Sequence, residues 1–168
     1  MDTPYAYLFM INNMHCKKQS EVKNKYFKEA HYDWCEKYIK GKVKEIKKGV
    51  VNGIVKVDVG NGIILSSNCS MESIEALNLT EGKEVEVIVK AMEVMLAKEK
   101  LNIGARNQVE GTVFEVKKGA VNGIVKLKTD NGLVFTANLS LESIEELGIK
   151  EGEKAVAIFK AMNVLLMA

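Results

Sequence analysis

The sequence is poor in several residue types that mark common protein classes. It has one proline, two histidines and one tryptophan in 168 residues, and its three cysteines form no CxxC pair. So few cysteines exclude a disulfide-rich framework, and we expect reduced thiols in a cytoplasmic protein. No apolar run approaches the roughly 18 residues that a membrane helix needs. Asp2 is acidic and no basic run opens the chain, so no signal peptide is expected.

An excess of charge of either sign is also missing. The chain has 24 Lys and Arg against 22 Asp and Glu, a net charge of +2. The lysines are interleaved with glutamates, which is typical of a solvated surface rather than a basic face for nucleic acid. With 47% hydrophobic and 27% charged residues, the composition is that of an ordinary soluble globular protein.

The dominant feature is an internal repeat. Residues 41–97 match residues 111–167 without gaps at an offset of 70 positions, and roughly half of the aligned residues are identical. About half of the other pairs exchange one apolar residue for another. The chain therefore contains two copies of one module, here called the first copy and the second copy.

Each copy shows the pattern of short strands. Apolar and polar residues alternate at 43–48 and 54–59, as in strands with one buried face. Later strands are expected at 85–89 and 94–96, and in the second copy at 155–159 and 164–166. Tight turns with positive φ are predicted at Asn52-Gly53, Asn61-Gly62, Asn122-Gly123 and Asn131-Gly132.

A short helix is predicted in each copy after a serine. Ser70 and Ser140 have the hydroxyl that caps a helix. An acidic residue in the first turn complements the helix dipole, and two apolar residues are expected to face the core. These residues are Glu72, Ile74 and Leu77 in the first copy, and Glu142, Ile144 and Leu147 in the second.

The predicted fold class is all-β, with two tandem OB-like Greek-key small barrels that each carry one short helix. The predicted domains are 40–98 and 104–168, joined by a short polar link, and an N-terminal extension, partly helical or disordered, covers 1–39. A unit of about 60 residues buries little surface alone. We therefore expect a homo-oligomer.

The second copy resembles a Mop domain, a molybdate- and tungstate-binding module, and the tandem pair is similar to two-domain molbindins. The family opens with SARNQ and has KAS at the end of a late strand. The resemblance covers 104–168 well, covers 40–97 nearly as well and does not cover 1–39. Its residues are Gly104-Ala105-Arg106-Asn107-Gln108, Gly111, the Lys-Gly-Ala-Val-Asn-Gly of 118–123, the Glu-Ser-Ile-Glu-Glu-Leu of 142–147, and Lys160-Ala161.

The resemblance implies that molybdate or tungstate binds between domains in an assembly with threefold symmetry, a trimer of two-domain chains. No cation and no membrane is implied. One class of site would use the GARN segment of one domain with the serine and lysine of a neighbour. These residues are Gly104, Ala105, Arg106, Asn107, Ser143, Lys160 and Ala161 in the second copy, and Ser73, Lys90 and Ala91 in the first. A second class would use the backbone at Val121-Asn122 and Val51-Asn52.

The chemistry of the residues agrees with this implication. A deprotonated oxyanion offers only acceptors, so its site should offer only donors. Arg106 supplies a fork of N–H groups, Lys160 a point charge and Ser143 a hydroxyl, while turn amides form a nest. Taken singly, Lys160 is equally typical of a solvated strand end, and Asn52 and Asn122 of simple turns.

The chain departs from the family pattern at three positions. Gly104 stands where the family has the first serine, so the backbone N–H remains and the hydroxyl is lost. Met92 and Met162 follow Lys-Ala where the family has another serine. Each change removes a donor from the predicted site.

The first copy has Trp34-Cys35-Glu36-Lys37-Tyr38 where the second has GARNQ. The codons for Asp33 to Lys37, read with a shift of one base, are compatible with Thr-Gly-Ala-Arg-Asn. Lys28-Glu29 is compatible with a ribosome-binding sequence, and a start codon can overlap the codons before Asp33. We therefore hypothesise that residues 1 to about 39 are a translated leader followed by a frameshift. Codons TGT for Cys35 and GAA for Glu36 would contradict it.

Three alternatives remain open for this segment. A genuine helical extension over 21–38 would present a partial apolar stripe that includes Tyr26, Phe27 and Trp34. A zinc site would use histidines and cysteines, although no CxxC supports it. A degenerate helix-turn-helix is the third alternative, since the family occurs fused to one in regulators, but no turn separates two periodic helices. The zinc ligands would be His15, Cys16, His31 and Cys35.

The predicted function is molybdate or tungstate binding for cytoplasmic storage, buffering or homeostasis of molybdenum. The alternative is an oxyanion-sensing module of a transcription regulator or transporter. The copies contain no histidine, so acid–base catalysis lacks its usual residues and no enzyme is expected. The chain has no phosphate-binding GxxxxGK[ST] loop. Nucleic-acid binding is not expected, because the copies hold few aromatics for base stacking.

Overall fold

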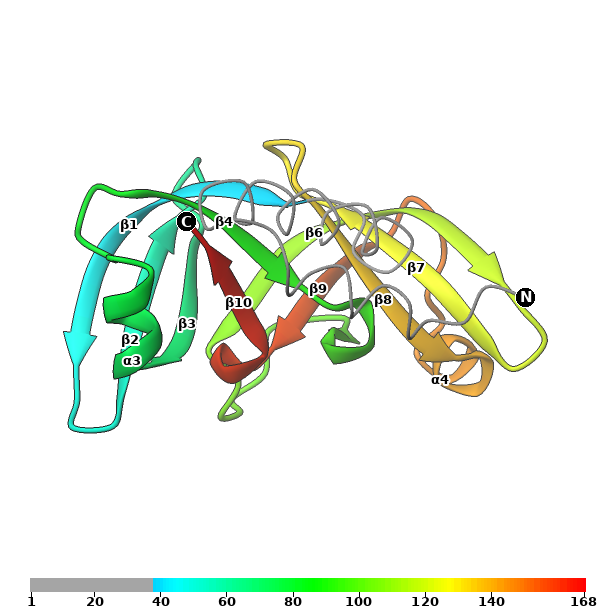
Figure 1. The fold of residues 1–168 in the computed structure, drawn as a ribbon. Helices are drawn as coiled ribbons and strands as arrows, with labels where there is room; N and C mark the ends of the chain where they lie inside the picture. Colours follow the sequence, from blue (N-terminus) through cyan, green and yellow to red (C-terminus); the bar gives the residue numbers. More distant parts are fainter. Residues whose placement is uncertain (1–37) are drawn as a thin grey trace, which may run out of the picture. The chain divides into compact units, whose positions relative to one another are not determined.

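The computed structural model describes residues 38–168, and both copies fold into the same succession of elements (Figure 1). The first copy has β1 (Ile39–Lys48), β2 (Asn52–Asp58), β3 (Ile64–Ser70), α3 (Met71–Ala76), β4 (Glu84–Val89), the 3₁₀ helix η1 (Ala91–Glu93) and β5 (Met95–Ala97). The second copy has β6 (Asn107–Lys118), β7 (Asn122–Lys128), β8 (Val134–Ser140), α4 (Leu141–Glu146), β9 (Lys154–Phe159), η2 (Ala161–Asn163) and β10 (Val164–Met167). The predicted mostly-β class, with one short α-helix in each copy, is confirmed.

Most of the predicted N-terminal extension, including its proposed zinc ligands and helix, lies outside the described residues. Among the residues that are described, no helix has the length and apolar character to cross a membrane.

The last strand of each copy belongs to the sheet of the other copy. One sheet has the order β10-β4-β1-β2-β3 and the other β5-β9-β6-β7-β8. β10 pairs antiparallel with β4, with Val164 opposite Val89, and β5 pairs with β9, with Met95 opposite Ile158. The repeat predicts each final strand in the barrel of its own copy, and the structure corrects this prediction. The described residues 38–168 accordingly belong to one compact unit.

The helix caps form as predicted. The Ser70 hydroxyl accepts a hydrogen bond from the Ser73 N–H at 3.1 Å, and Ser140 accepts from Ser143 at the same distance. Each cap satisfies one of the free N–H groups that begin a helix. Ile74 is buried in the core, as is its counterpart in the second copy.

Two of the four predicted Asn-Gly turns are strand residues instead. Asn52-Gly53 and Asn122-Gly123 lie in β2 and β7, and neither pair has positive φ. A Cβ at Gly53 would lie 2.7 Å from the Ile74 Cδ1 atom, and one at Gly123 would lie 2.6 Å from Ile144 Cδ1. These glycines are therefore required by close packing of the helix rather than by a turn.

The other two Asn-Gly pairs lie in the connections after β2 and β7, with φ of +77° at Gly62 and +83° at Gly132. A glycine at these positions adopts the left-handed region without the steric cost of a side chain.

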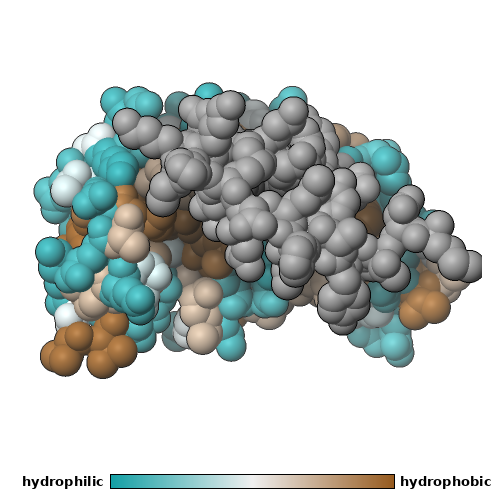
Figure 2. All heavy atoms as spheres, viewed as in Figure 1, coloured by the Kyte–Doolittle hydropathy of each residue, from teal (hydrophilic) through white to brown (hydrophobic). Residues whose placement is uncertain are grey.

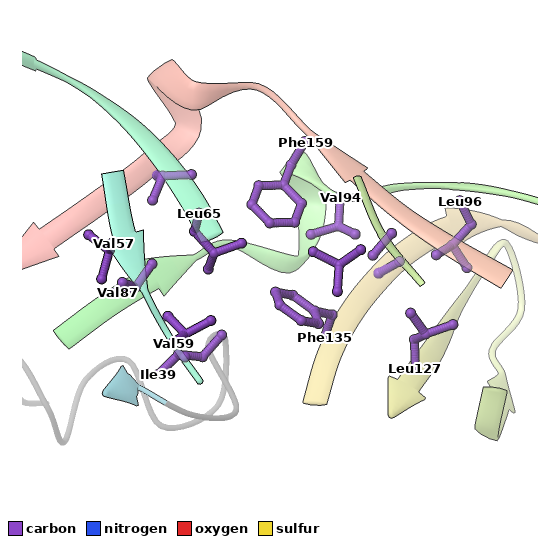
Figure 3. Packing of buried hydrophobic residues seen from close by; sticks show 14 of the residues in the cluster. Ile39, Val57, Val59, Leu65, Val87, Val94, Leu96, Leu127, Phe135 and Phe159 are labelled. Atoms are coloured by element: carbon purple, nitrogen blue, oxygen red, sulfur yellow. The ribbon is translucent and has the colours of Figure 1, made fainter. Parts of the chain in front are cut away.

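One hydrophobic core draws on both copies. Phe135 and Phe159 stack at its centre with ring centroids 5.6 Å apart, between apolar residues of the first copy such as Leu65 and Val94 (Figure 3). A buried hydrogen bond also crosses between the copies, because the Ser67 hydroxyl donates to the Val164 carbonyl at 2.7 Å. The exchanged strands and this shared core make the two copies fold as a unit.

Candidate functional site

Two cationic side chains flank one end of the β6–β9 pair. Asn107 opens β6 and is the register partner of Phe159, which ends β9. The next residues beyond this pair, Arg106 and Lys160, therefore lie at the same end of the two strands. Both are exposed, and within residues 38–168 neither forms an ion pair. Two unpaired positive charges thus stand together and are open to solvent.

Backbone donors accompany these charges. Lys160 is the N-cap residue of η2 in an extended conformation, so the amide of Ala161 lies at the start of this helix, where N–H groups lack partners within the helix. On the other strand, Gly104 is exposed and Ala105 is 5% exposed. The structure therefore brings together most of the residues predicted for the second copy.

Asn107 holds a different position from its predicted neighbours. Its side chain is only 1% exposed. The Ser66 N–H of β3, in the other copy, donates to Asn107 Oδ1 at 2.7 Å, and Asn107 Nδ2 donates to the Ser66 carbonyl at 2.9 Å. Both ends of the amide are thus engaged with one backbone residue of the first copy.

The remaining predicted residues form a second group beside the helices. In the second copy, the Val121 carbonyl accepts from the Leu141 N–H at 2.9 Å, Asn122 is the register partner of Ser140, and the Ser140 hydroxyl donates to that of Ser143 at 2.8 Å.

The first copy repeats this second group. The Val51 carbonyl accepts from the Met71 N–H at 2.9 Å, Asn52 is opposite Ser70, and the Ser70 and Ser73 hydroxyls are 2.8 Å apart. Val51 is 72% exposed, as is its neighbour Val50 at 99%. Both lie in the connection between β1 and β2, where Figure 2 shows hydrophobic surface at lower left.

The two groups do not meet within one chain. The Arg106–Lys160 group lies at the start of β6, whereas Val121, Asn122 and Ser143 lie beyond its far end. Eleven steps along β6 separate Asn107 from Lys118, which is about 35 Å of strand at the usual rise. A site that uses both Lys160 and Ser143 therefore requires a second copy of the chain.

The first copy has only part of the cationic group. Lys90 is exposed and caps η1 as Lys160 caps η2, with Ala91 following it. The sequence positions that match Gly104 to Asn107 are 34 to 37, which lie outside the described residues. In the structure, η1 packs on β8 of the second copy, as η2 packs on β3 of the first.

Carboxylates near the barrels are engaged with lysines. Glu45 lies 2.7 Å from Lys56, and Glu115 lies 2.7 Å from Lys126. The hydrogen bond from each of these lysines is the main reason that the pKa of its partner carboxyl lies below the ordinary value. Across residues 38–168, no three His, Cys, Asp or Glu side chains gather as a metal site would require. The chemistry of the described donors is that of an anion site.

Comparison with known proteins agrees with this geometry. The family model for the TOBE domain matches residues 36–96 and 104–166. The chain belongs to the TOBE domain family. The match occurs twice, so the sequence repeat is a repeat of this domain, and the relatives below confirm the predicted resemblance to molybdate-binding modules.

Among its curated relatives, the molybdenum transport protein ModE of Azotobacter vinelandii is 34% identical over 127 residues, covering 75% of this chain and 47% of that protein. Molybdenum-pterin-binding protein 3 of Clostridium pasteurianum is 44% identical over 68 residues, covering 40% of this chain and all of that protein. The chain spans about half the length of the ModE relatives it matches.

A solved structure matches both copies together. The cytoplasmic molybdate-binding protein ModG, in a form with molybdate bound, superposes with a TM-score of 0.75 at 39% identity, covering 77% of this chain and 94% of that chain. This TOBE chain therefore shares its two-copy fold with a protein that holds molybdate.

Sequence reasoning missed the residues that join the copies. Ser66, Ser67 and the Asn163–Glu93 hydrogen bond of 2.5 Å between η2 and η1 were not predicted. A repeat shows which positions correspond, but it gives no signal of which copy supplies a partner.

Proposed function

We propose that this chain binds molybdate or tungstate and serves in cytoplasmic storage or buffering of molybdenum. The observation that carries the proposal is the pair of exposed, unpaired cations Arg106 and Lys160 at one end of the β6–β9 pair. The cytoplasmic molybdate-binding protein ModG, which has the same two-copy fold, supports both the ligand and the compartment.

The anion would exchange its water shell for fixed donors. Arg106 offers a planar fork of N–H groups and Lys160 a compact charge, while the amides at Gly104, Ala105 and Ala161 extend the donor set. Charge-assisted hydrogen bonds of this kind contribute about 1.5–3 kcal/mol each. Several such bonds are enough to hold a small dianion at micromolar concentration.

The proposal includes an oligomer. Ser143, Val121 and Asn122 lie beyond the far end of β6 from Lys160, and Ser73, Val51 and Asn52 form the equivalent group in the first copy. They would contribute from a neighbouring chain, as in a trimer of two-domain chains. The exposed Val50 and Val51, at 99% and 72%, support such an association, because large apolar side chains at a turn tip gain from burial.

We propose no catalytic activity for the site. The described donors include no nucleophile paired with a base, and a carrier needs neither.

Isothermal titration calorimetry with molybdate, tungstate and sulfate tests the proposal, and light scattering on the same samples reports the oligomeric state. We expect molybdate and tungstate to bind at micromolar concentration or below, with sulfate weaker. A folded chain that binds none of the three would overturn the function.

A regulatory role is the second candidate, because the chain aligns with about half of ModE from two bacteria. A gel shift with and without molybdate separates the two. DNA binding that depends on molybdate would favour the sensor, and its absence would favour the carrier.

A further inference from the structure

The amide of Asn107 completes a strand-like pair with the other copy. It accepts from the Ser66 N–H at 2.7 Å and donates to the Ser66 carbonyl at 2.9 Å. Two bonds to the N–H and C=O of one residue are what a neighbouring strand would supply to β3. A side chain thus takes the place of a backbone partner at this point.

This arrangement leaves Asn107 poorly suited to bind an ion. Its side chain is 1% exposed, whereas Arg106 on one side is exposed. The Oδ1 atom is an acceptor and cannot bind an anion. Of the two N–H groups on Nδ2, one donates to Ser66, and the residue that carries them is almost completely buried. An ion that arrives from solvent meets Arg106 and Lys160 first.

The bonds lie where the chain crosses between the two sheets. Lys160 stands between β9 in one sheet and β10 in the other, and η2, which follows it, packs on β3. Asn107 ties the start of β6 to the same β3. Arg106 and Lys160 are therefore both held against one strand of the first copy, which fixes their relative position.

We propose that Asn107 is a positioning residue: its two hydrogen bonds to Ser66 hold the start of β6, and with it Arg106, against β3, on which the η2 segment after Lys160 also packs, and it does not itself bind the anion. The inference rests on the proposed function for its effect on affinity. Preorganised donors bind better because less ordering is needed when the ligand arrives, so loss of these bonds should weaken binding without removing any charge.

The matching position of the first copy has a different chemistry. The residue that matches Asn107 at an offset of 70 is Lys37, whose ammonium group has donors but no acceptor. The Lys37 side chain therefore cannot accept and donate at once, as the Asn107 amide does.

The test uses the full chain and the Asn107→Ala substitution, with Asn107→Ser as a second variant should alanine fail to fold. Ser67→Ala is the matched control. It removes another buried hydrogen bond from β3 to the other copy, and the equivalent residue of the second copy is already Ala137. The readouts are hydrogen exchange at the Ser66 amide without ligand, and molybdate titration.

We expect Asn107→Ala to speed exchange at the Ser66 amide and to weaken molybdate affinity by about tenfold, which corresponds to about 1.4 kcal/mol, because the donors are less well preorganised. Ser67→Ala should retain the wild-type affinity while it lowers the melting temperature.

Three outcomes would overturn the positioning role. Weaker affinity with unchanged Ser66 exchange would make Asn107 a direct ligand. Faster exchange with unchanged affinity would make its bonds purely structural. Equal losses of affinity in Asn107→Ala and Ser67→Ala would indicate general destabilisation. Failure of the proposed function is distinct, because it appears as absence of binding in the wild-type chain.

Discussion

In the second copy, β6 begins at Asn107 and places Arg106 at the same end of the strand pair as Lys160. In the first copy, β1 begins at Ile39, and Tyr38, which matches Gln108, lies outside the strand. The barrels nevertheless share their strands, caps and bulges, since both first strands shift register at equivalent positions, after Val43 and after Val113. The fold therefore does not depend on the residues that carry the anion chemistry.

The copies also differ in how they are joined. Ser67 on β3 reaches the Val164 carbonyl, and Asn107 reaches Ser66, so two polar contacts fasten β3 to the second copy. At the equivalent place on β8, the residue that matches Ser67 is Ala137, which has no hydroxyl. The two junctions of this pseudo-symmetric molecule thus have different polar contacts.

The largest expected effect concerns the two equivalent lysines. Lys160→Ala should weaken molybdate binding by about tenfold to a hundredfold, because it removes a charge-assisted bond of about 1.5–3 kcal/mol. Lys90→Ala should have a smaller effect, because Glu36 in the first copy stands where the second has Arg106. Calorimetry on both variants measures the difference. Equal losses of affinity in the two variants would show that both copies bind molybdate in the same way.

A graft should reduce the difference between the copies. Trp34→Gly, Cys35→Ala, Glu36→Arg and Lys37→Asn together place GARN at the positions that match 104–107. We expect more molybdate to bind per chain, because a guanidinium and an amide replace a carboxylate and an amine. The stoichiometry from titration is the measurement, and the same graft combined with Lys90→Ala is the control. An unchanged stoichiometry would mean that the missing donors do not limit the first copy.

The junction through β3 gives a moderate effect on stability. Ser67→Ala should lower the free energy of unfolding by about 1–3 kcal/mol, because it leaves a buried carbonyl without its donor. Ser66→Ala is the comparison. Because Ser66 contacts Asn107 through its backbone, this variant should lose less free energy of unfolding. Urea unfolding measures both. A neutral Ser67→Ala would show that water replaces the hydroxyl.

The smallest effect comes from the paired carboxylates. The hydrogen bond from Lys56 lowers the pKa of Glu45 below its ordinary 4.5, and that from Lys126 does so for Glu115. A carboxyl whose pKa is lower in the folded than in the unfolded state stabilises the fold at pH values above its unfolded-state pKa. This contribution to the free energy of unfolding is lost as the pH falls through the folded-state pKa. Melting temperatures measured from about pH 6 to about pH 3 should therefore fall less on acidification in Glu45→Gln and Glu115→Gln than in the wild-type chain.

The two substitutions should differ slightly. The Lys126 side chain is 14% exposed against 33% for Lys56, so solvent screens the pair in the second copy less. A weaker dependence of the melting temperature on pH in Glu45→Gln than in Glu115→Gln would contradict this ranking.

Local patterns in the sequence predicted the elements well. Ser70 and Ser140 cap their helices, and the alternation at 43–48 and 54–59 corresponds to strands. The exchange of β5 and β10 could not be predicted, because the two copies are so alike that either sheet offers the same apolar partners. Gly53 illustrates another limit, because a glycine is needed there for close contact with Ile74, which is distant in the sequence.

For the candidate site, the residue types were predictable and their grouping was not. Arg106 and Lys160 are brought together by strand pairing, whereas Ser143 belongs to a separate cluster around the helix cap. The burial of Asn107 depends on β3 of the other copy, which no pattern around residue 107 reveals.

The exchanged strands have a consequence for single-copy relatives such as the 68-residue match in Clostridium pasteurianum. A single copy with the arrangement of this chain would have its last strand outside its own sheet, and the edge of that sheet would be open to pairing with another chain. Two such modules could complete each other's sheets by exchanging their last strands. The free-energy cost of bringing the two chains together would rise as their concentration falls. Fusion into one polypeptide makes that exchange intramolecular, at an effective concentration in the millimolar range for a short connection. The nine residues that join β5 to β6, 98–106, thereby let the two copies complete each other's sheets without an encounter between separate chains.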